Sequence, residues 1–292
     1  MKKIVYIPIL LLLLAGLRSG FYFKGAVLDF YNNAAKNLEH IQQGDFGIIV
    51  SMATKNIFTP PPLNIGGQEN NAVFVKANII AQTNIQRFNN GNFPPLMENA
   101  KLSAAARAKA EDMFKNQYFE HISPSGVDPG TLVKSFGYEY IVSGENLILG
   151  NFADEKELVQ AWMDSPGHRA NILHNRFTEI GVAVVKGIYQ GRSAWISVQE
   201  FGLPLSVCPE PPVSAKQKIE NNKITLTELE AQINTKRQEI NNTNPRSSQY
   251  NAKVDEYNNL VAQYNQLANS TKDLIVNYNS QINAFNECVV GN

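Results

Sequence analysis

The strongest constraint on the fold is a seven-residue repeat of apolar side chains that begins after residue 204. In its first segment the repeated positions are Ile219, Leu226, Ile233 and Ile240. In its second segment they are Val254, Val261, Ala268, Ile275, Ile282 and Val289, and Tyr257, Tyr264, Thr271, Tyr278 and Phe285 follow the first five by three residues. Such a repeat forms the a and d stripe of a coiled coil. Two coiled-coil helices are therefore predicted within residues 205–292.

A polar segment, residues 241–248, separates the two repeats and contains Pro245. Asparagine and proline clusters end helices, and this segment is long enough to reverse the chain. An antiparallel helical hairpin is therefore expected. Association with a second chain through the same repeat is the alternative use of these residues.

The N-terminus places two lysines before a long apolar run, MKKIVYIPILLLLLAGL. This arrangement is typical of an export signal or a membrane anchor. Residues 4–17 are fewer than the roughly 20 that span a bilayer, but residues 20–23 extend the run. We interpret residues 1–24 as a signal peptide or an uncleaved anchor, and we favour the anchor because no clear cleavage site follows. With Lys2 and Lys3 inside, the rest is extracytoplasmic, either secreted or anchored to the cytoplasmic membrane.

The chain has two cysteines, Cys208 and Cys288. If the predicted helices pair across their turn, Pro212 lies opposite Tyr278. Four extended residues lead from Pro212 back to Cys208, about 13 Å, which equals about nine residues of helix. That distance ends next to Cys288, so a disulfide at the base of the hairpin is predicted. Unpaired thiols or an intermolecular bridge are the alternatives.

Residues 25–71 carry three consecutive prolines, at positions 60 to 62. Proline removes a backbone donor and interrupts regular structure. We interpret residues 25–71 as a stem or a small accessory layer, which ends in a linker before residue 72. His40 lies in this range without a motif around it, and a solvated position is expected for it.

Residues 72–204 contain helical patterns followed by strand patterns. Apolar spacing predicts two helices, one over 72–88 and one that contains residues 102–113 and runs on into residues 117–121, so that His121 sits at or just past its end. Capping signals predict two more helices, which start at Asp154 and at Ser165. Two β-branched runs, 180–185 and 194–201, flank a turn at Gly191 and predict an antiparallel hairpin. Helices followed by a hairpin are typical of an α+β domain with helices packed on an antiparallel sheet.

Two histidines and a glutamate stand in short polar motifs within this range. His121 occurs in YFEHISPSG, Glu145 in SGENL and His168 in SPGHR. We expect His121 and Glu145 where regular structure gives way to a turn, a common place for functional side chains, and His168 just inside the helix that starts at Ser165. Imidazole nitrogens are good ligands for Zn²⁺, and a carboxylate can orient an imidazole or accept a proton from bound water.

These motifs resemble the bacterial branch of the CAP superfamily, the group of cysteine-rich secretory proteins, antigen 5 and pathogenesis-related 1. The matching elements are FEHISPSG, GENL and WxxSPGHRxNIL, followed by EIGVAVV and WxSVQEFG. The resemblance covers residues 72–204 and implies an α-β-α sandwich with a cleft lined by His121, Glu145 and His168. In many eukaryotic relatives a second glutamate follows the tryptophan by three residues. Here that position is Ser165, and its neighbour Asp164 points elsewhere around a helix.

Together these features predict an extracytoplasmic binding or interaction module with a solvent-facing His/Glu cleft. His121 and His168 are the candidate metal ligands, and Zn²⁺ or another weakly bound divalent cation is the candidate cofactor. A metal-assisted hydrolase of the cell envelope, peptidase-like or esterase-like with Glu145 as general base, is the alternative function. A purely structural hydrogen-bonded network is the third interpretation.

The expected partners follow from charge and from the terminal segments. Acidic and basic residues balance at 26 each, and no basic stripe is present, so nucleic acid is not an expected partner. A membrane is expected to hold the N-terminal segment. The ligand is expected to be a protein, a lipid or a cell-wall component, and self-association through the C-terminal repeat is the remaining interaction considered.

Overall fold

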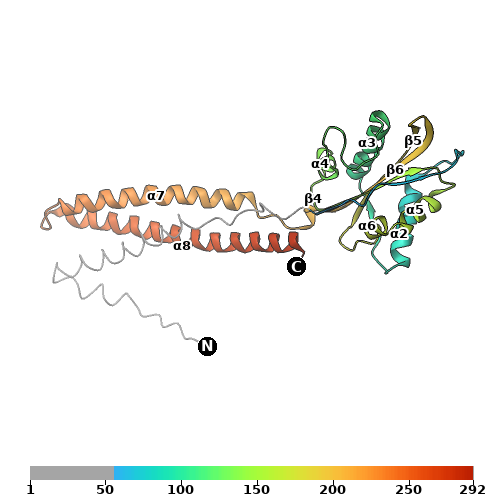
Figure 1. The fold of residues 1–292 in the computed structure, drawn as a ribbon. Coiled ribbons are helices and arrows are strands. Elements are labelled where there is room, and N and C mark those ends of the chain that lie inside the picture. Colours follow the sequence, from blue (N-terminus) through green and yellow to red (C-terminus); the bar gives the residue numbers. More distant parts are fainter. Residues whose placement is uncertain (1–55, 292) are drawn as a thin grey trace. The chain divides into compact units, whose positions relative to one another are not determined.

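The computed structural model describes residues 56–291 (Figure 1). The predicted anchor, residues 1–24, and most of the predicted stem, His40 included, lie outside the described residues. The described residues divide into two compact units, one made of residues 56–209 with 286–291 and the other made of residues 210–285. Within the described range, no helix combines the length and the apolar character needed to cross a bilayer.

A mixed sheet of six strands, counted among residues 56–291, forms the middle layer of the first unit (Figure 1). The long strands are β4 (Tyr140–Gly150), β5 (Glu179–Tyr189) and β6 (Arg192–Pro204). Strand β6 lies between β4 and β5 and is antiparallel to both. Parallel pairing adds the short strands β1 (Asn56–Phe58), β2 (Leu63–Gly66) and β3 (Met97–Glu98). The expectation of an antiparallel sheet is thus correct for the long strands and wrong for the short edge strands.

Strands β5 and β6 form the hairpin that the sequence predicts. Gln190 and Gly191 join them, with φ angles of 47° and 79°. Two consecutive positive φ angles are typical of the type I′ turn, whose twist matches that of the flanking strands. Both strands extend beyond the predicted β-branched runs because pairing continues to the turn at Tyr189 and Arg192.

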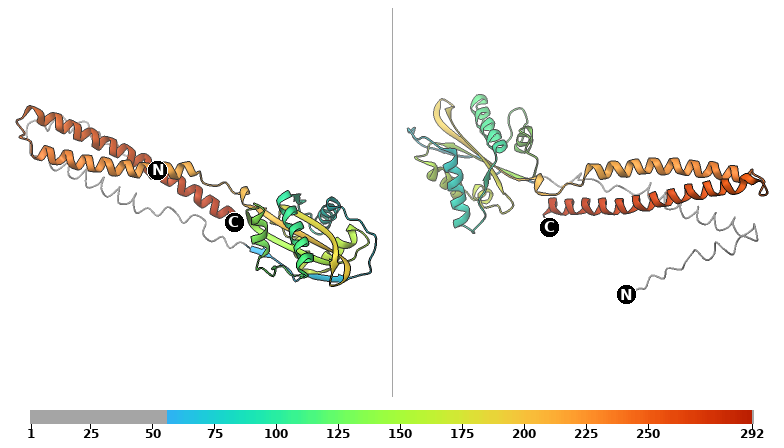
Figure 2. Two further views of the ribbon diagram at one scale, coloured as in Figure 1. Left: turned by 90° about the horizontal axis from the view of Figure 1, so that it is seen from above. Right: turned by 180° about the vertical axis from the view of Figure 1, so that it is seen from behind.

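Helices cover both faces of the sheet, which gives three layers (Figure 1, Figure 2). One face carries α3 (Ala100–Asn116) and α4 (Pro129–Ser135). The other carries α2 (Lys76–Asn89), α5 (Glu155–Asp164) and α6 (Pro166–Ile172). Helix α5 starts as predicted, because the Asp154 carboxylate accepts a hydrogen bond from the backbone N–H of Glu157 at 2.8 Å. Helix α4 was not predicted from the sequence.

The second unit consists of two long helices that lie side by side in both figures, α7 (Val213–Asn241) and most of α8 (Ser248–Val290). Residues of the predicted stripe are buried between them. From α7 these are Ile219, Leu226 and Ile233, and from α8 they are Tyr257, Tyr264, Ala268, Thr271, Tyr278, Ile282 and Phe285. Ile219 packs with Tyr278 and Ile282, near the opposite ends of the two helices, so the helices are antiparallel.

The predicted disulfide is confirmed: Cys208 is bonded to Cys288, with a Cα–Cα distance of 5.7 Å. Cys208 follows a short 3₁₀ turn, η3 (Leu205–Val207), at the end of β6. Near the other cysteine, the Arg176 guanidinium donates to the backbone oxygen of Val289 at 3.1 Å. The end of α8 is thus held by both a covalent bond and a charged donor.

Candidate functional site

His121 lies just beyond α3, as predicted. Gln117 ends the helix in the left-handed conformation, with φ of 53°. The ammonium group of Lys109, within α3, donates to the backbone oxygen of His121 at 2.6 Å. The imidazole is fixed at both nitrogens: Nδ1 lies 2.6 Å from Glu145 Oε1, and Nε2 lies 2.5 Å from the backbone oxygen of Pro60.

These two contacts define how the ring is protonated. The Pro60 carbonyl can only accept, so Nε2 of His121 carries a hydrogen. The contact at Nδ1 then has two forms: the ring is a cation that donates to the Glu145 carboxylate, or a protonated Glu145 donates to a neutral ring. In either form one proton lies between the imidazole and the acid.

Glu145 lies in the middle of β4, so the expectation that it sits at a turn is wrong. The preceding glycine of the GEN motif is explained by close packing. A Cβ on Gly144 would lie 2.8 Å from the Phe177 ring and 3.3 Å from the backbone oxygen of Phe58. The amide of Asn171 supports the strand by donating to the backbone oxygen of Glu145 at 3.3 Å.

His168, on α6, is brought to the same cluster and is only 1% exposed. Its Nδ1 lies 2.8 Å from the Ser165 hydroxyl, so Ser165 occupies the predicted N-cap position but uses its side chain to hold the imidazole. Burial, and secondly the neighbouring His121, lower the pKa of His168 to about 4. The imidazole is therefore neutral at neutral pH.

The second acid of the cluster is Glu200 on β6, which sequence reasoning missed. It pairs directly with Glu145 across the β4–β6 ladder and is fully buried. Burial, and then the adjacent Glu145 carboxyl, raise the pKa of Glu200 well above its ordinary value, while Lys109 opposes the rise. Neither Ser165 nor Asp164 supplies this acid. The sequence did contain a signal, since a glutamate in the WxSVQEFG strand must lie among apolar neighbours.

Lys109 is the second residue that was missed. It is 3% exposed, and burial lowers the pKa of its ammonium group, whereas Glu145 and Glu200 act in the opposite direction. Its position was readable from helical spacing: Lys109 lies three residues after Ala106 and four before Met113, both on the buried face of α3. The cluster therefore combines two acids, two imidazoles and one ammonium group.

Four polar atoms of this cluster are buried without a fully formed hydrogen bond: Glu145 Oε2, His168 Nε2 and both carboxyl oxygens of Glu200. They have weaker contacts within the domain, because the Glu145 and Glu200 carboxyl groups interact with each other and His168 interacts with the backbone of Leu147. An unsatisfied buried polar atom costs about 1–3 kcal/mol, and native structures keep few of them. The expected solvent-facing cleft is not what the structure shows, because Glu145 and Glu200 are 0% exposed and the side chain of His121 is 12% exposed. The Pro60 carbonyl lies over His121 and contributes to this closure.

The arrangement does not fit a resident metal ion. Nε2 of His121 donates to a carbonyl and Nδ1 faces Glu145, so this ring presents no lone pair to a cation. Among the described residues, no group of three or more His, Cys, Asp or Glu side chains is arranged to hold a metal. The His168 imidazole bonds to the Ser165 hydroxyl and interacts with the backbone of Leu147, so this ring also has partners within the domain.

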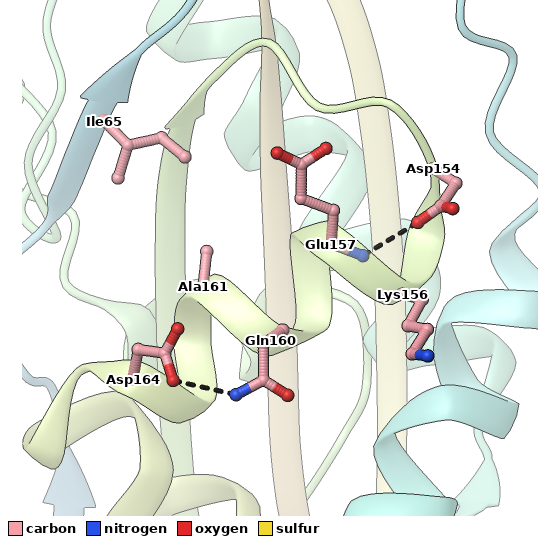
Figure 3. A pocket seen from close by; sticks show the side chains of 7 residues that line it. All are labelled: Ile65, Asp154, Lys156, Glu157, Gln160, Ala161 and Asp164. Carbon is pink, nitrogen blue, oxygen red and sulfur yellow. Dashed lines mark hydrogen bonds between the residues drawn. The ribbon is translucent and has the colours of Figure 1, made fainter.

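Two further side chains near the motifs lie outside the cluster. His174 is partly buried: its ring lies 4.7 Å from that of Phe58 and 4.5 Å from that of Phe177. Asp164 lines a hollow of about 440 Å³ against α5, away from the cluster, and Gln160 donates to its carboxylate (Figure 3). Asp164 therefore takes no part in the His/Glu cluster.

The lowered pKa of His168 predicts a loss of stability in mild acid. The unfolded chain binds a proton at this imidazole near pH 6.5, and the folded domain does so only near pH 4. The contribution of His168 to the free energy of unfolding is therefore fully present above pH 6.5. It falls as the pH drops towards 4, by about 2 kcal/mol between pH 6.5 and pH 5. In urea unfolding, the free energy of unfolding of His168→Gln should fall less between pH 6.5 and pH 5 than that of wild type. His174→Gln keeps His168 and should therefore still show the decrease that His168 causes. Equal losses in wild type and His168→Gln would contradict the assignment.

Comparison with known proteins gives a consistent match to one part of the chain. Residues 81–201 match the family described as "Cysteine-rich secretory protein family" (CAP). An uncharacterized protein of Bacillus subtilis, YkwD, is 44% identical over 108 residues, which are 37% of this chain and 41% of YkwD. The uncharacterized membrane protein YlbC of the same organism is 29% identical over 111 residues, 38% of this chain and 32% of YlbC. The chain thus covers less than half the length of these curated relatives.

Two solved structures are also similar to parts of the chain. An extracellular protein containing an SCP domain from Bacillus anthracis shares 30% identity, with a TM-score of 0.37, over 44% of this chain and 39% of that one. An outer surface protein of Borrelia burgdorferi shares 20% identity, with a TM-score of 0.39, over 44% of this chain and 91% of that one.

Proposed function

Since residues 81–201 form a domain of the CAP family, the cysteine-rich secretory protein family, we propose that the chain is an extracytoplasmic binding module. Its ligand site is the cluster of His121, Glu145, His168 and Glu200. The observation that carries this proposal is the convergence of two carboxyl groups and an imidazole from β4, β6 and α6, which are buried with fewer hydrogen-bond partners than their polar atoms can take.

The energetic argument is that a purely structural network would satisfy its members. Apolar residues of similar size at Glu200 and His168 would avoid the cost of burying polar groups without partners. That cost is retained beside His121, whose Nε2 holds a backbone carbonyl that a ligand can replace. The side chains are also held in place beforehand, since Asn171 and Asn146 donate to the backbone oxygens of Glu145 and His168.

An extracytoplasmic location is supported by two independent features. The N-terminal lysines and apolar run predict export, with a membrane anchor or a signal peptide at residues 1–24. The two cysteines form a disulfide, and such bonds persist mainly in oxidising compartments. We extend the proposal to the second unit: α7 and α8 form an antiparallel coiled coil that is exported with the domain.

Binding explains the geometry better than metal-assisted hydrolysis does. A catalytic zinc requires imidazole lone pairs and an open position for water. His121 has both nitrogens engaged, and the acid that would act as general base, Glu145, has one oxygen on that ring. The cluster in this arrangement is therefore a recognition site, and His121 must lose its contact with Pro60 before any ligand reaches its Nε2.

The proposal is tested by measuring binding and turnover with the same protein. We expect the full chain to bind purified murein sacculi or phosphatidylglycerol vesicles in sedimentation assays, and the double variant His121→Ala with His168→Ala to bind at least about tenfold more weakly. Arg169→Ala is the matched control, because its guanidinium donates to Asn90 on the surface, outside the cluster.

Turnover is the second part of the same test. We expect no hydrolysis of peptide, ester or murein substrates, with or without added Zn²⁺. Metal-dependent turnover that Glu145→Gln abolishes would replace the binding module with the hydrolase. Binding that is unchanged in the double histidine variant would show that the cluster is not the ligand site.

A further inference from the structure

A segment of the chain itself lies against the cluster. We call residues 56–66, NIFTPPPLNIG, the strap. Its strands β1 and β2 both pair parallel with β4, where Phe58 is opposite Gly144 and Leu63 is opposite Ile148. The ladder is interrupted between these two pairs, opposite residues 145–147. The interruption in the strap therefore coincides with Glu145.

At this interruption the backbone of the strap is recognised by site residues. The oxygen of Pro60 accepts a hydrogen bond from Nε2 of His121 at 2.5 Å, across 61 residues of sequence. The oxygen of Phe58 accepts one from the Asn171 amide at 3.0 Å. Proline has no N–H to satisfy, so a proline segment leaves the ladder here without orphan donors. The site thus forms hydrogen bonds with backbone carbonyl groups of an extended chain segment.

The side chains of the strap have matching surfaces on the domain. The ring of Phe58 lies 4.7 Å from that of His174 and 6.3 Å from that of Phe177. A Cβ on Gly167, in the SPGH motif, would lie 2.7 Å from Cβ of Pro60. Phe58 therefore packs against an aromatic surface of the domain, and Pro60 occupies the space that the missing side chain of Gly167 leaves free.

Glycines line the path of the strap along its whole length. Besides Gly167, a Cβ on Gly130 would lie 2.4 Å from the end of Ile57, and a Cβ on Gly150 would lie 2.7 Å from the side chain of Ile65. A Cβ on Gly144 would lie 3.3 Å from the backbone oxygen of Phe58. None of these four glycines has a positive φ angle, so close packing and not turn geometry accounts for them. The strap is the nearest contact at Gly150 and Gly167, whereas Tyr140 is nearest at Gly130 and Phe177 is nearest at Gly144.

The strap is nevertheless a surface segment. None of residues 56–66 is fully buried, and Phe58 is 38% exposed. The strap also lies outside residues 81–201, the range of the CAP family match. Beside its second strand the packing is open, because Ile65 borders the hollow that α5 lines with Asp154, Glu157 and Asp164 (Figure 3). A segment with so little buried surface can be exchanged for another at modest cost.

We propose that the site recognises an extended, proline-containing peptide, and that the strap is a tethered copy of this ligand that occupies the site until an external peptide replaces it. This inference rests on the proposed function and names its ligand class. The external peptide adds to the edge of β4, places an aromatic side chain against His174 and Phe177, and presents a carbonyl group to His121. This is strand addition, in which backbone bonds give affinity and side-chain positions give specificity.

Tethering determines how the wild-type protein behaves. A segment linked to its site by a short chain acts at an effective concentration of about a millimolar, so an external peptide competes poorly. If the strap occupies its site more than about 90% of the time, its removal strengthens external binding by at least about tenfold. Release of the strap also exposes the edge of β4, which an incoming strand then covers.

The test uses the full chain and a fluorescent peptide with the strap sequence, NIFTPPPLNIG. We expect weak binding to wild type, and at least tenfold tighter binding to a chain in which Phe58→Asp and Ile65→Asp weaken the strap. Both positions are partly exposed, so the domain core is retained, and circular dichroism verifies that the variant is folded. A scrambled peptide of the same composition is the control ligand.

A third substitution identifies the site. Adding Gly167→Ala to the strap variant places a Cβ where the proline of the peptide must lie, and alanine is favourable within a helix. This chain should stay folded and lose peptide binding by tenfold or more. Unchanged binding in this variant, or no binding to the folded strap variant without it, would overturn the inference.

Failure here is distinguishable from failure of the proposed function. If the strap peptide does not bind but sacculi or vesicles bind through His121 and His168, the binding module stands and its ligand is not a peptide. If neither the peptide nor the envelope material depends on the cluster, both proposals fail.

Discussion

Replacing Cys208 and Cys288 with serine is expected to lower the free energy of unfolding of the helical hairpin by about 4.5 kcal/mol. The bond closes a loop with a sequence separation of 80, which contains α7 and nearly all of α8. In the unfolded chain this closure removes conformations, and the loss grows with the logarithm of loop length. Urea unfolding followed by helix ellipticity measures the effect.

Two controls separate loop closure from changes in packing. Reduction of the wild-type protein should reproduce the result of the double serine variant, since both open the same loop. Each single serine variant should lose about as much as the double variant, because either change alone breaks the bond. A loss below about 1 kcal/mol would contradict the entropic argument, and a dimer band on non-reducing gels would favour the intermolecular alternative.

The hairpin and its disulfide could be predicted because long-range structure there follows from a local period. Positions seven apart identify the buried stripe, and the helical rise then fixes which residues lie opposite each other. The five residues that follow the repeat by three in the second segment are all buried, from Tyr257 to Phe285. The rise per residue of a helix and of an extended chain was enough to predict that Cys208 lies near Cys288.

Strand β4 could not be predicted in the same way. All eleven of its residues are buried, so it lacks the alternation that identifies a half-exposed strand. Its SGEN segment contains small and polar residues, which resemble a turn. For this reason Glu145 was expected at the end of an element, although it lies in the centre of the sheet.

The composition of the cluster was predicted in part. The motifs identified His121, Glu145 and His168, which the structure brings together around the β4–β6 ladder. Glu200 and Lys109 were missed because a single charge within an apolar pattern is read as an exception to the pattern. The contact between Pro60 and His121 had no local signal at all, since it joins residues from different elements across 61 positions.

Gly181→Ala is expected to destabilise the domain by about 3 kcal/mol or more. Gly181 lies in β5 beneath the first turn of α3, and an added Cβ would lie 2.1 Å from the carbonyl carbon of Leu102 and 2.2 Å from the backbone nitrogen of Ser103. Backbone atoms cannot rotate away as a side chain does, so α3 must shift from the sheet. Thermal and urea unfolding measure the loss.

The matched control is Gly191→Ala in the turn of the same β5–β6 hairpin. Its Cβ would meet no atom within 4 Å, so only the positive φ of 79° is penalised, at about 1–2 kcal/mol. The substitution at Gly181 should also affect ligand binding, because this glycine pairs with Glu200 and because α3 carries Lys109, whose positive charge acts on that carboxyl group. A Gly181→Ala protein as stable as Gly191→Ala would show that α3 does not rest on β5 as described.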